Sequence, residues 1–142
     1  MIRFFDIIFS IIGLVILSPI FIVLYLLIRI ESKGGGFYSQ ERIGKNGKPF
    51  KLYKFRSMRI GSDKKGLITI GEKDNRITKT GFILRKYKLD ELPQLWNVFI
   101  GDMSLVGPRP EVKKYTDLYT EEQKQVLQVR PGITDWASIK YV

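Results

Sequence analysis

The sequence contains neither cysteine nor histidine among its 142 residues. The lack of cysteine excludes a disulfide framework, a thiolate nucleophile and a Cys-ligated zinc site. The lack of histidine removes the commonest general base and the commonest metal ligand. Catalysis must therefore use carboxylates, Lys, Arg, Tyr, Ser or Thr, and any bound metal should be a hard, oxygen-ligated cation, with Mg²⁺ as the default.

Charge is almost absent before residue 32, where the charged side chains are those of Arg3, Asp6, Arg29 and Glu31. The other 111 residues hold 22 Lys and Arg against 12 Asp and Glu, which leaves a net charge of +10. This balance suits an anionic partner, namely a membrane surface, a nucleotide or nucleic acid.

The segment Phe4–Ile28 is apolar and long enough for one membrane-spanning helix, but Ser18-Pro19 falls near its middle. A signal peptide fits poorly, because the apolar stretch is too long and no A-x-A-like site follows. Two alternatives stay open. A spanning helix would be kinked at Pro19, since neighbouring groups can satisfy the freed carbonyl. A re-entrant hairpin would turn at Ser18-Pro19, with arms of about 21 and 16 Å, each shorter than the roughly 30 Å hydrocarbon core.

Basic residues flank both ends of this apolar segment. The positive-inside rule therefore does not orient a spanning helix, whereas a hairpin places all of these charges on the cytoplasmic side.

The polar remainder is long enough for one domain of short strands and helices. Asn46-Gly47 predicts a hairpin turn between strands at 37–43 and 49–58. Residues 60–79 are predicted as a loop, 81–86 and about 90–99 as helices, and 119–129 as a helix with a Thr120/Gln123 capping box. The end of the sequence is predicted as a loop, with a terminal strand as the alternative.

Asp90-Glu91 is the only adjacent carboxylate pair in a basic neighbourhood, because Arg85, Lys86 and Lys88 precede it. One interpretation is structural: Asp90 caps a helix, and Pro93 lies in its first turn. The functional interpretation is that the pair binds Mg²⁺, that Arg85 helps to bind a phosphate, and that the flanking cations keep Asp90 ionised as a nucleophile.

Two basic motifs are further candidates. Arg109 lies between two prolines in GPRP, so its backbone is stiff and its side chain suits bidentate phosphate binding. The alternative is a rigid turn with a solvated arginine. In YKFRSM, Lys54 and Arg56 share one face of a predicted strand. The alternative is that this is only a solvated basic strand face.

Taken together, three stretches resemble the bacterial sugar transferase family. They are YKFRSM, RKYKLDELPQLWNVFIGDMSLVGPRPE and VRPGITDWA, in that order. These proteins are monotopic phosphoglycosyl transferases that initiate glycan assembly on polyprenyl phosphate. The resemblance implies an α+β protein in two parts. Residues 1–31 would form a re-entrant membrane helix-break-helix turned at Ser18-Pro19, and residues 32–142 a small cytoplasmic α/β catalytic domain on the bacterial inner membrane.

The resemblance also implies the chemistry. A sugar-1-phosphate would move from a UDP-sugar to polyprenyl (undecaprenyl) phosphate with release of UMP, through an aspartyl-phosphosugar intermediate. Asp90 matches the nucleophile, and Glu91 matches its Mg²⁺-binding partner. Arg85 matches a phosphate-binding arginine, and Lys54 and Arg109 match basic residues of the active-site face. Membrane lipid would be a partner and nucleic acid would not.

Two features depart from the family pattern. Asp135 stands where many members have Gly, and members usually continue for some tens of residues beyond the position of Val142. The sequence is therefore expected to be either a short member or one that lacks a C-terminal membrane-associated segment. The alternative function is a membrane-anchored basic module for acidic lipid or nucleic acid, although no nucleic-acid-binding motif occurs in the sequence.

Overall fold

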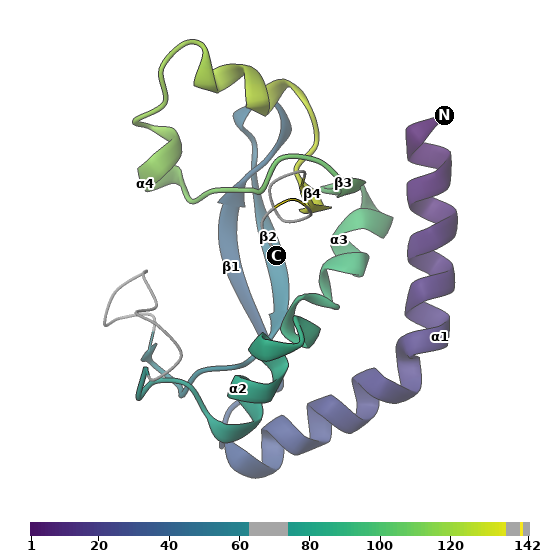
Figure 1. Ribbon diagram of the computed structural model, residues 1–142, viewed down its shortest axis with the longest axis vertical. Helices are drawn as coiled ribbons and strands as arrows, with labels where there is room; N and C mark the ends of the chain where they lie inside the picture. Colours follow the sequence, from purple (N-terminus) through teal and green to yellow (C-terminus); the bar gives the residue numbers. More distant parts are fainter. Residues whose placement is uncertain (63–73, 136–139, 141–142) are drawn as a thin grey trace. The chain divides into compact units, whose positions relative to one another are not determined.

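The computed structural model describes residues 1–62, 74–135 and 140 of this protein, which mixes helices and short strands (Figure 1). The chain forms two compact units. The first unit contains Met1–Ile16, Ser39–Tyr53 and Gln94–Val142, and the second contains Leu17–Tyr38 and Lys54–Pro93. Both units include part of the N-terminal helix. The division predicted at residue 31 concerns the membrane environment and stays a prediction.

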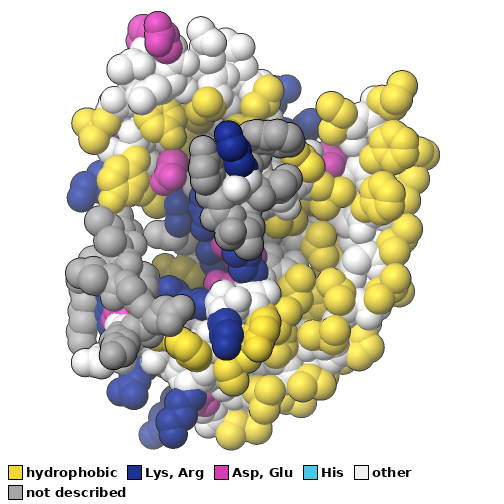
Figure 2. Space-filling view, viewed as in Figure 1, with side chains coloured by type: hydrophobic (Ala, Val, Ile, Leu, Met, Phe, Trp, Pro, Cys, Tyr) yellow, Lys and Arg dark blue, Asp and Glu magenta, His cyan; other side chains and the backbone are white. Residues whose placement is uncertain are grey.

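Helix α1 (Ile2–Glu31) comprises the whole apolar segment and contains Pro19. It is long and apolar enough to cross a membrane, and only 6% of its most apolar 18-residue window is buried. Figure 2 shows hydrophobic side chains along its visible surface. The helix includes both Ser18 and Pro19, and the proline removes one backbone donor within it. The re-entrant path therefore stays a prediction.

Strands β1 (Phe37–Ile43) and β2 (Pro49–Phe55) form a two-stranded sheet. The predicted turn is confirmed: the connecting 3₁₀ turn η1 (Lys45–Gly47) has left-handed φ angles of 60° at Asn46 and 71° at Gly47. Only Gly and Asn adopt this conformation readily. The second strand ends three residues earlier than predicted.

In the first unit, a core of Leu52, Val98 and Met103 joins β2 to α3 (Gln94–Ile100) and to the segment that follows it. Strands β3 (Ser104–Val106) and β4 (Gly132–Thr134) pair in parallel. The alternative of a strand near the end of the sequence is thus confirmed. A Cβ atom on Gly132 would lie 2.0 Å from the Gly107 nitrogen, so the RPG and GPRP motifs meet at two glycines.

The prediction of one helix over 119–129 is wrong in the length and the type of helix. After the short helix α4 (Lys113–Thr116), only a 3₁₀ helix, η4 (Gln123–Gln128), forms there, and it has no buried residue. Without a packed face, a short segment gains little from helix formation. The capping box is confirmed: Gln123 N–H donates to Thr120 Oγ1 at 3.3 Å, and Thr120 N–H donates to Gln123 Oε1 at 3.0 Å.

The core of the second unit consists of Ile28, Phe55 and Leu84, with partly buried apolar side chains from α1 around it. Two helical segments follow, α2 (Lys79–Lys86) and the 3₁₀ turn η3 (Leu89–Glu91). The helix predicted at about 90–99 is therefore two separate elements, η3 and α3. Of the predicted loop at 60–79, residues 63–73 lie outside the described residues.

Candidate active site

The turn between α2 and η3 positions the carboxylate pair. Lys88 adopts a left-handed conformation, with φ 54°, and donates its N–H to the Arg85 carbonyl. The chain then forms η3, in which Asp90 is 8% exposed. Helix α3 begins at Gln94, four residues after Asp90. The interpretation of Asp90 as the N-cap of a helix is therefore wrong, because Asp90 lies within η3 and α3 begins only four residues later.

Burial and three charged neighbours set the ionisation of Asp90. Loss of solvent raises the pKa of its carboxyl, and the charge of Glu91 raises it further, whereas the charges of Lys54 and Arg85 lower it. The net shift is upward from the ordinary value. Asp90 is thus a desolvated carboxyl within the electrostatic reach of two cations and one like charge.

Lys54 lies on β2, and its Nζ is 3.2 Å from Glu91 Oε1. The two side chains are 21% and 18% exposed, so this ion pair is largely shielded from water. The alternative of a solvated basic strand face is therefore wrong for Lys54. Arg56 instead donates from Nε to the Gly35 carbonyl at 2.9 Å, which gives it a contact within the fold.

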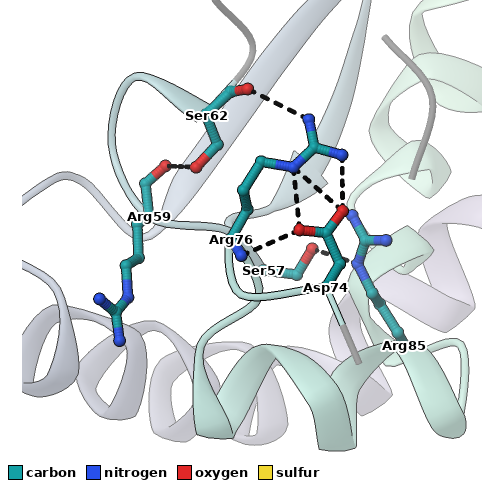
Figure 3. Close-up of polar contacts among 6 residues, drawn as sticks. All are labelled: Ser57, Arg59, Ser62, Asp74, Arg76 and Arg85. Carbon is teal, nitrogen blue, oxygen red and sulfur yellow. Dashed lines mark hydrogen bonds and ion pairs between the residues drawn. The ribbon is translucent and has the colours of Figure 1, made fainter. Parts of the chain in front are cut away.

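Arg85 lies in the last turn of α2, and its Nε donates to Ser57 Oγ at 2.9 Å (Figure 3). The guanidinium therefore contacts the KFRSM segment and lies within electrostatic range of Asp90. Four of the predicted site residues, Lys54, Arg85, Asp90 and Glu91, therefore lie together in the second unit.

Arg109, the fifth predicted residue, is exposed in the first unit, in the loop after β3. Three hydrogen bonds hold this loop. Gly107 N–H donates to the Thr134 carbonyl at 3.0 Å, Gly132 N–H to Pro108 O at 2.9 Å, and Arg42 Nη1 to Pro110 O at 3.2 Å. These hydrogen bonds restrain the loop backbone, and the role of Arg109 at a phosphate stays a prediction.

The family profile of bacterial sugar transferases matches residues 1–142. The chain belongs to the bacterial sugar transferase family. The predicted membership is thereby confirmed, and the motifs that suggested it contain the carboxylate pair and its cations.

The matches to three relatives each cover most of this chain. A Bacillus subtilis (strain 168) protein, provisionally named undecaprenyl-phosphate N-acetylgalactosaminyl 1-phosphate transferase, is 48% identical over 84% of the chain and 67% of the relative. The UDP-N-acetylgalactosamine-undecaprenyl-phosphate N-acetylgalactosaminephosphotransferase of Aeromonas hydrophila is 40% identical over 96% of the chain and 33% of the relative. The UDP-glucose:undecaprenyl-phosphate glucose-1-phosphate transferase of Escherichia coli (strain K12) is 39% identical over 94% and 30%. The chain thus spans about two thirds of the first relative and about a third of the other two.

A metal in this sugar transferase would have few protein ligands. Within the described ranges, which omit 63–73 and the masked positions near the C-terminus, no group of three or more acidic side chains is arranged to hold an ion. Asp90 and Glu91 supply two adjacent carboxylates, both hard oxygen donors. Mg²⁺ commonly uses one or two carboxylates and completes its shell with substrate phosphate and water. The donor set therefore fits Mg²⁺ bound together with a diphosphate.

Sequence reasoning missed three residues with long-range contacts, two of them in the unit that contains the site. Ser57 is one, because a serine in a basic strand carries no signal of its own. Glu31 is another: its carboxylate accepts N–H bonds from Lys79 at 2.7 Å and Thr80 at 2.8 Å, at the start of α2. Asp6 did have a signal, since it is an acid within an apolar run; it is 4% exposed and accepts from Ser104 Oγ at 2.8 Å.

Proposed function

We propose that this chain transfers a sugar-1-phosphate from a UDP-sugar to undecaprenyl phosphate, or a related polyprenyl phosphate, with release of UMP. One observation carries the proposal: a desolvated carboxyl, Asp90, lies beside two cations and a second carboxylate in a member of the bacterial sugar transferase family. The relatives described above are named for undecaprenyl phosphate, and two of them are named for UDP-sugars.

The proposed reaction has two displacements at one phosphorus. An oxygen of the ionised Asp90 carboxylate attacks the phosphorus that bears the sugar, the bond from this phosphorus to UMP breaks, and UMP leaves with the electron pair. An oxygen of the polyprenyl phosphate then attacks the same phosphorus. The Asp90 carboxylate is released, and the product is a polyprenyl diphosphosugar. Covalent catalysis of this kind divides one difficult transfer into two easier ones.

The remaining residues have electrostatic roles in this proposal. Arg85 binds the diphosphate as a planar, permanently charged fork, and Arg109 supplies a second such group. Lys54 holds Glu91 and favours the ionised form of Asp90. Mg²⁺ held by Asp90 and Glu91 would neutralise diphosphate charge, which an anionic nucleophile needs before it can approach.

The membrane placement belongs to the same proposal. The polyprenyl substrate is lipid-soluble, and α1 exposes an apolar surface of the length that a bilayer accommodates. We place the catalytic part on the cytoplasmic face of the bacterial inner membrane, with α1 re-entering at Ser18-Pro19 and with membrane lipid, rather than nucleic acid, as the surrounding partner.

Intact mass spectrometry tests the proposal. The full chain in detergent is incubated with Mg²⁺ and, in turn, UDP-glucose, UDP-galactose, UDP-N-acetylglucosamine and UDP-N-acetylgalactosamine, without acceptor. Wild type should gain the mass of one sugar-phosphate, mapped to the peptide that contains Asp90, and should release UMP. Asp90→Asn should form no adduct. Glu91→Gln should form it about 10²–10³ times more slowly, as expected for loss of one charge-stabilising group.

The matched control is Asp117→Asn, which changes an exposed carboxylate that forms an ion pair with Lys113 and should leave the rate unchanged. With acceptor present, initial rates should follow ping-pong kinetics. An adduct that persists in Asp90→Asn, or a rate law that requires a ternary complex, contradicts Asp90 as nucleophile. A basic binding module would release no UMP from any donor.

A further inference from the structure

The hydroxyl of Ser57 makes a contact that the proposed reaction does not require. Ser57 is 7% exposed, and its Oγ accepts a hydrogen bond from Arg85 Nε at 2.9 Å. Figure 3 shows the serine facing the guanidinium from the segment that follows β2. A hydrogen bond from a charged donor is roughly twice as strong as one between neutral groups. Because Nε lies in the guanidinium plane, this contact restrains both the position and the orientation of the fork.

The backbone of Ser57 is held independently of its side chain. Its carbonyl accepts the Thr78 N–H at 3.1 Å, and it lies so close to α2 that a Cβ atom on Gly81 would be 2.0 Å from it. Gly81 and Arg85 are four residues apart and therefore share one face of the helix. At Gly81 this face of the helix packs closely against the Ser57 carbonyl. One turn later, Arg85 on the same face donates its hydrogen bond to the serine hydroxyl.

An arginine that binds a ligand must first give up conformational freedom. A free Arg side chain loses rotamer entropy when it is ordered, and this loss opposes binding. A side chain that is already restrained loses less of it on binding. The serine hydroxyl supplies such a restraint at the Nε end of the guanidinium.

We propose that Ser57 is a positioning residue, whose hydroxyl holds the Arg85 guanidinium in the orientation in which it binds the diphosphate of the donor. The inference rests on the proposed function, because it takes Arg85 as the diphosphate ligand. Ser57 touches neither substrate nor the reacting phosphorus in this role; it acts through Arg85.

A double-mutant cycle with UDP as the probe tests the inference. The dissociation constant of UDP is measured for the full chain in detergent with Mg²⁺, for wild type, Ser57→Ala, Arg85→Ala and the double variant. Ser57→Ala should weaken UDP binding about tenfold or more, as expected for loss of a hydrogen bond to a charged group. In the Arg85→Ala background the same change should cost less than about twofold. Ser57→Thr keeps the hydroxyl and should retain most of the affinity.

The matched control is Ser62→Ala. Ser62 is also buried in this segment, but its Oγ donates to the Arg59 carbonyl at 2.5 Å (Figure 3). Its removal should leave UDP affinity unchanged. Equal losses for the two serine variants, or an equal loss from Ser57→Ala with and without Arg85, would overturn the inference. So would a lowered Tm for Ser57→Ala with unaltered UDP affinity, since that indicates a structural role alone.

The two proposals fail separately. If wild type releases no UMP from any UDP-sugar, the proposed function is wrong, whatever the serine variants do. If wild type is active but the cycle is additive, the reaction stands and Ser57 has no positioning role.

Discussion

At the scale of single residues, Asp90 combines two opposed requirements. In its proposed role as nucleophile it must be ionised, yet burial raises the pKa of its carboxyl above the ordinary value despite the charges of Lys54 and Arg85. The folded protein therefore binds a proton at Asp90 more tightly than the unfolded chain does. This contribution to stability is fully present below the unfolded pKa, about 3.9, and is lost as the pH rises through the folded pKa.

Asp90→Asn should consequently stabilise the metal-free protein at pH 7, because it removes a buried charge that the nearby cations do not fully compensate. The gain should be about 1.4 kcal/mol for each unit by which the folded pKa exceeds the unfolded one. It should vanish near pH 3, where wild-type Asp90 is protonated in both states. Thermal unfolding in chelator over this pH range measures the difference.

Two further measurements complete this prediction. Mg²⁺ should raise the Tm of wild type and have little effect on Asp90→Asn, because a ligand stabilises only the form that binds it. Glu122→Gln, at an exposed carboxylate, should change stability by less than about 0.5 kcal/mol at either pH. A lower Tm for Asp90→Asn at pH 7 would mean that the ionised carboxylate stabilises the fold.

At the scale of elements, α2 connects the end of α1 to the candidate site. The first N–H groups of a helix lack partners within the helix. In α2 they are satisfied by Glu31, which accepts from Lys79 and Thr80, and by Thr78 Oγ1, which accepts from Gly81 at 2.9 Å. An eight-residue helix is marginal by itself, so these contacts and the burial of Leu84 keep its last turn, with Arg85, in place.

Glu31→Ala should therefore loosen α2 from its first turn. The expected cost is about 1 kcal/mol of stability, the typical value for a lost N-terminal cap, with faster amide exchange at Lys79 and Thr80. Glu31→Gln keeps one acceptor oxygen and should fall between Ala and wild type. Glu41→Ala, at an exposed position of β1, is the matched control. Unchanged exchange at Lys79 and Thr80 in Glu31→Ala would show that α2 does not depend on this carboxylate.

At the scale of the whole molecule, the path of α1 determines where the chemistry takes place. A straight helix of 30 residues is about 45 Å long and would cross a hydrocarbon core of roughly 30 Å. A helix bent back at Ser18-Pro19 would instead leave both ends on one side. Only the second path keeps residues on both sides of the apolar segment in the compartment that supplies nucleotide sugars.

Because the chain has no cysteine, Ile2→Cys and Lys33→Cys each introduce a unique label site. In inverted and right-side-out membrane vesicles, an impermeant maleimide should modify both positions from the cytoplasmic side alone. Replacing Ser18 by Leu and Pro19 by Ala together favours a continuous helix and should move one of the two sites to the other side. If the two cysteines are labelled from opposite sides while Ser18 and Pro19 are retained, the re-entrant path is contradicted.

Several features followed from the sequence alone, for local physical reasons. Asn46-Gly47 specified the hairpin turn because few residues adopt a left-handed conformation, and Thr120 with Gln123 formed their reciprocal bonds because those bonds are local. Lys54, Arg85, Asp90 and Glu91 could be singled out because their charges stand in a recognisable motif.

Other features depended on tertiary packing. The segment at 119–129 has helical spacing, but its 3₁₀ helix η4 buries no residue, so packing does not stabilise a longer helix there. The predicted helix at about 90–99 is interrupted by Pro93, and the burial of Asp90 before this point sets its pKa. Ser57 and Glu31 acquire partners more than twenty residues away, and no local pattern specifies those partners. The sequence alone determined which charged groups are candidates for the chemistry. The tertiary structure decided which of them are desolvated and held in place, because burial and long-range hydrogen bonds arise only when distant segments pack together.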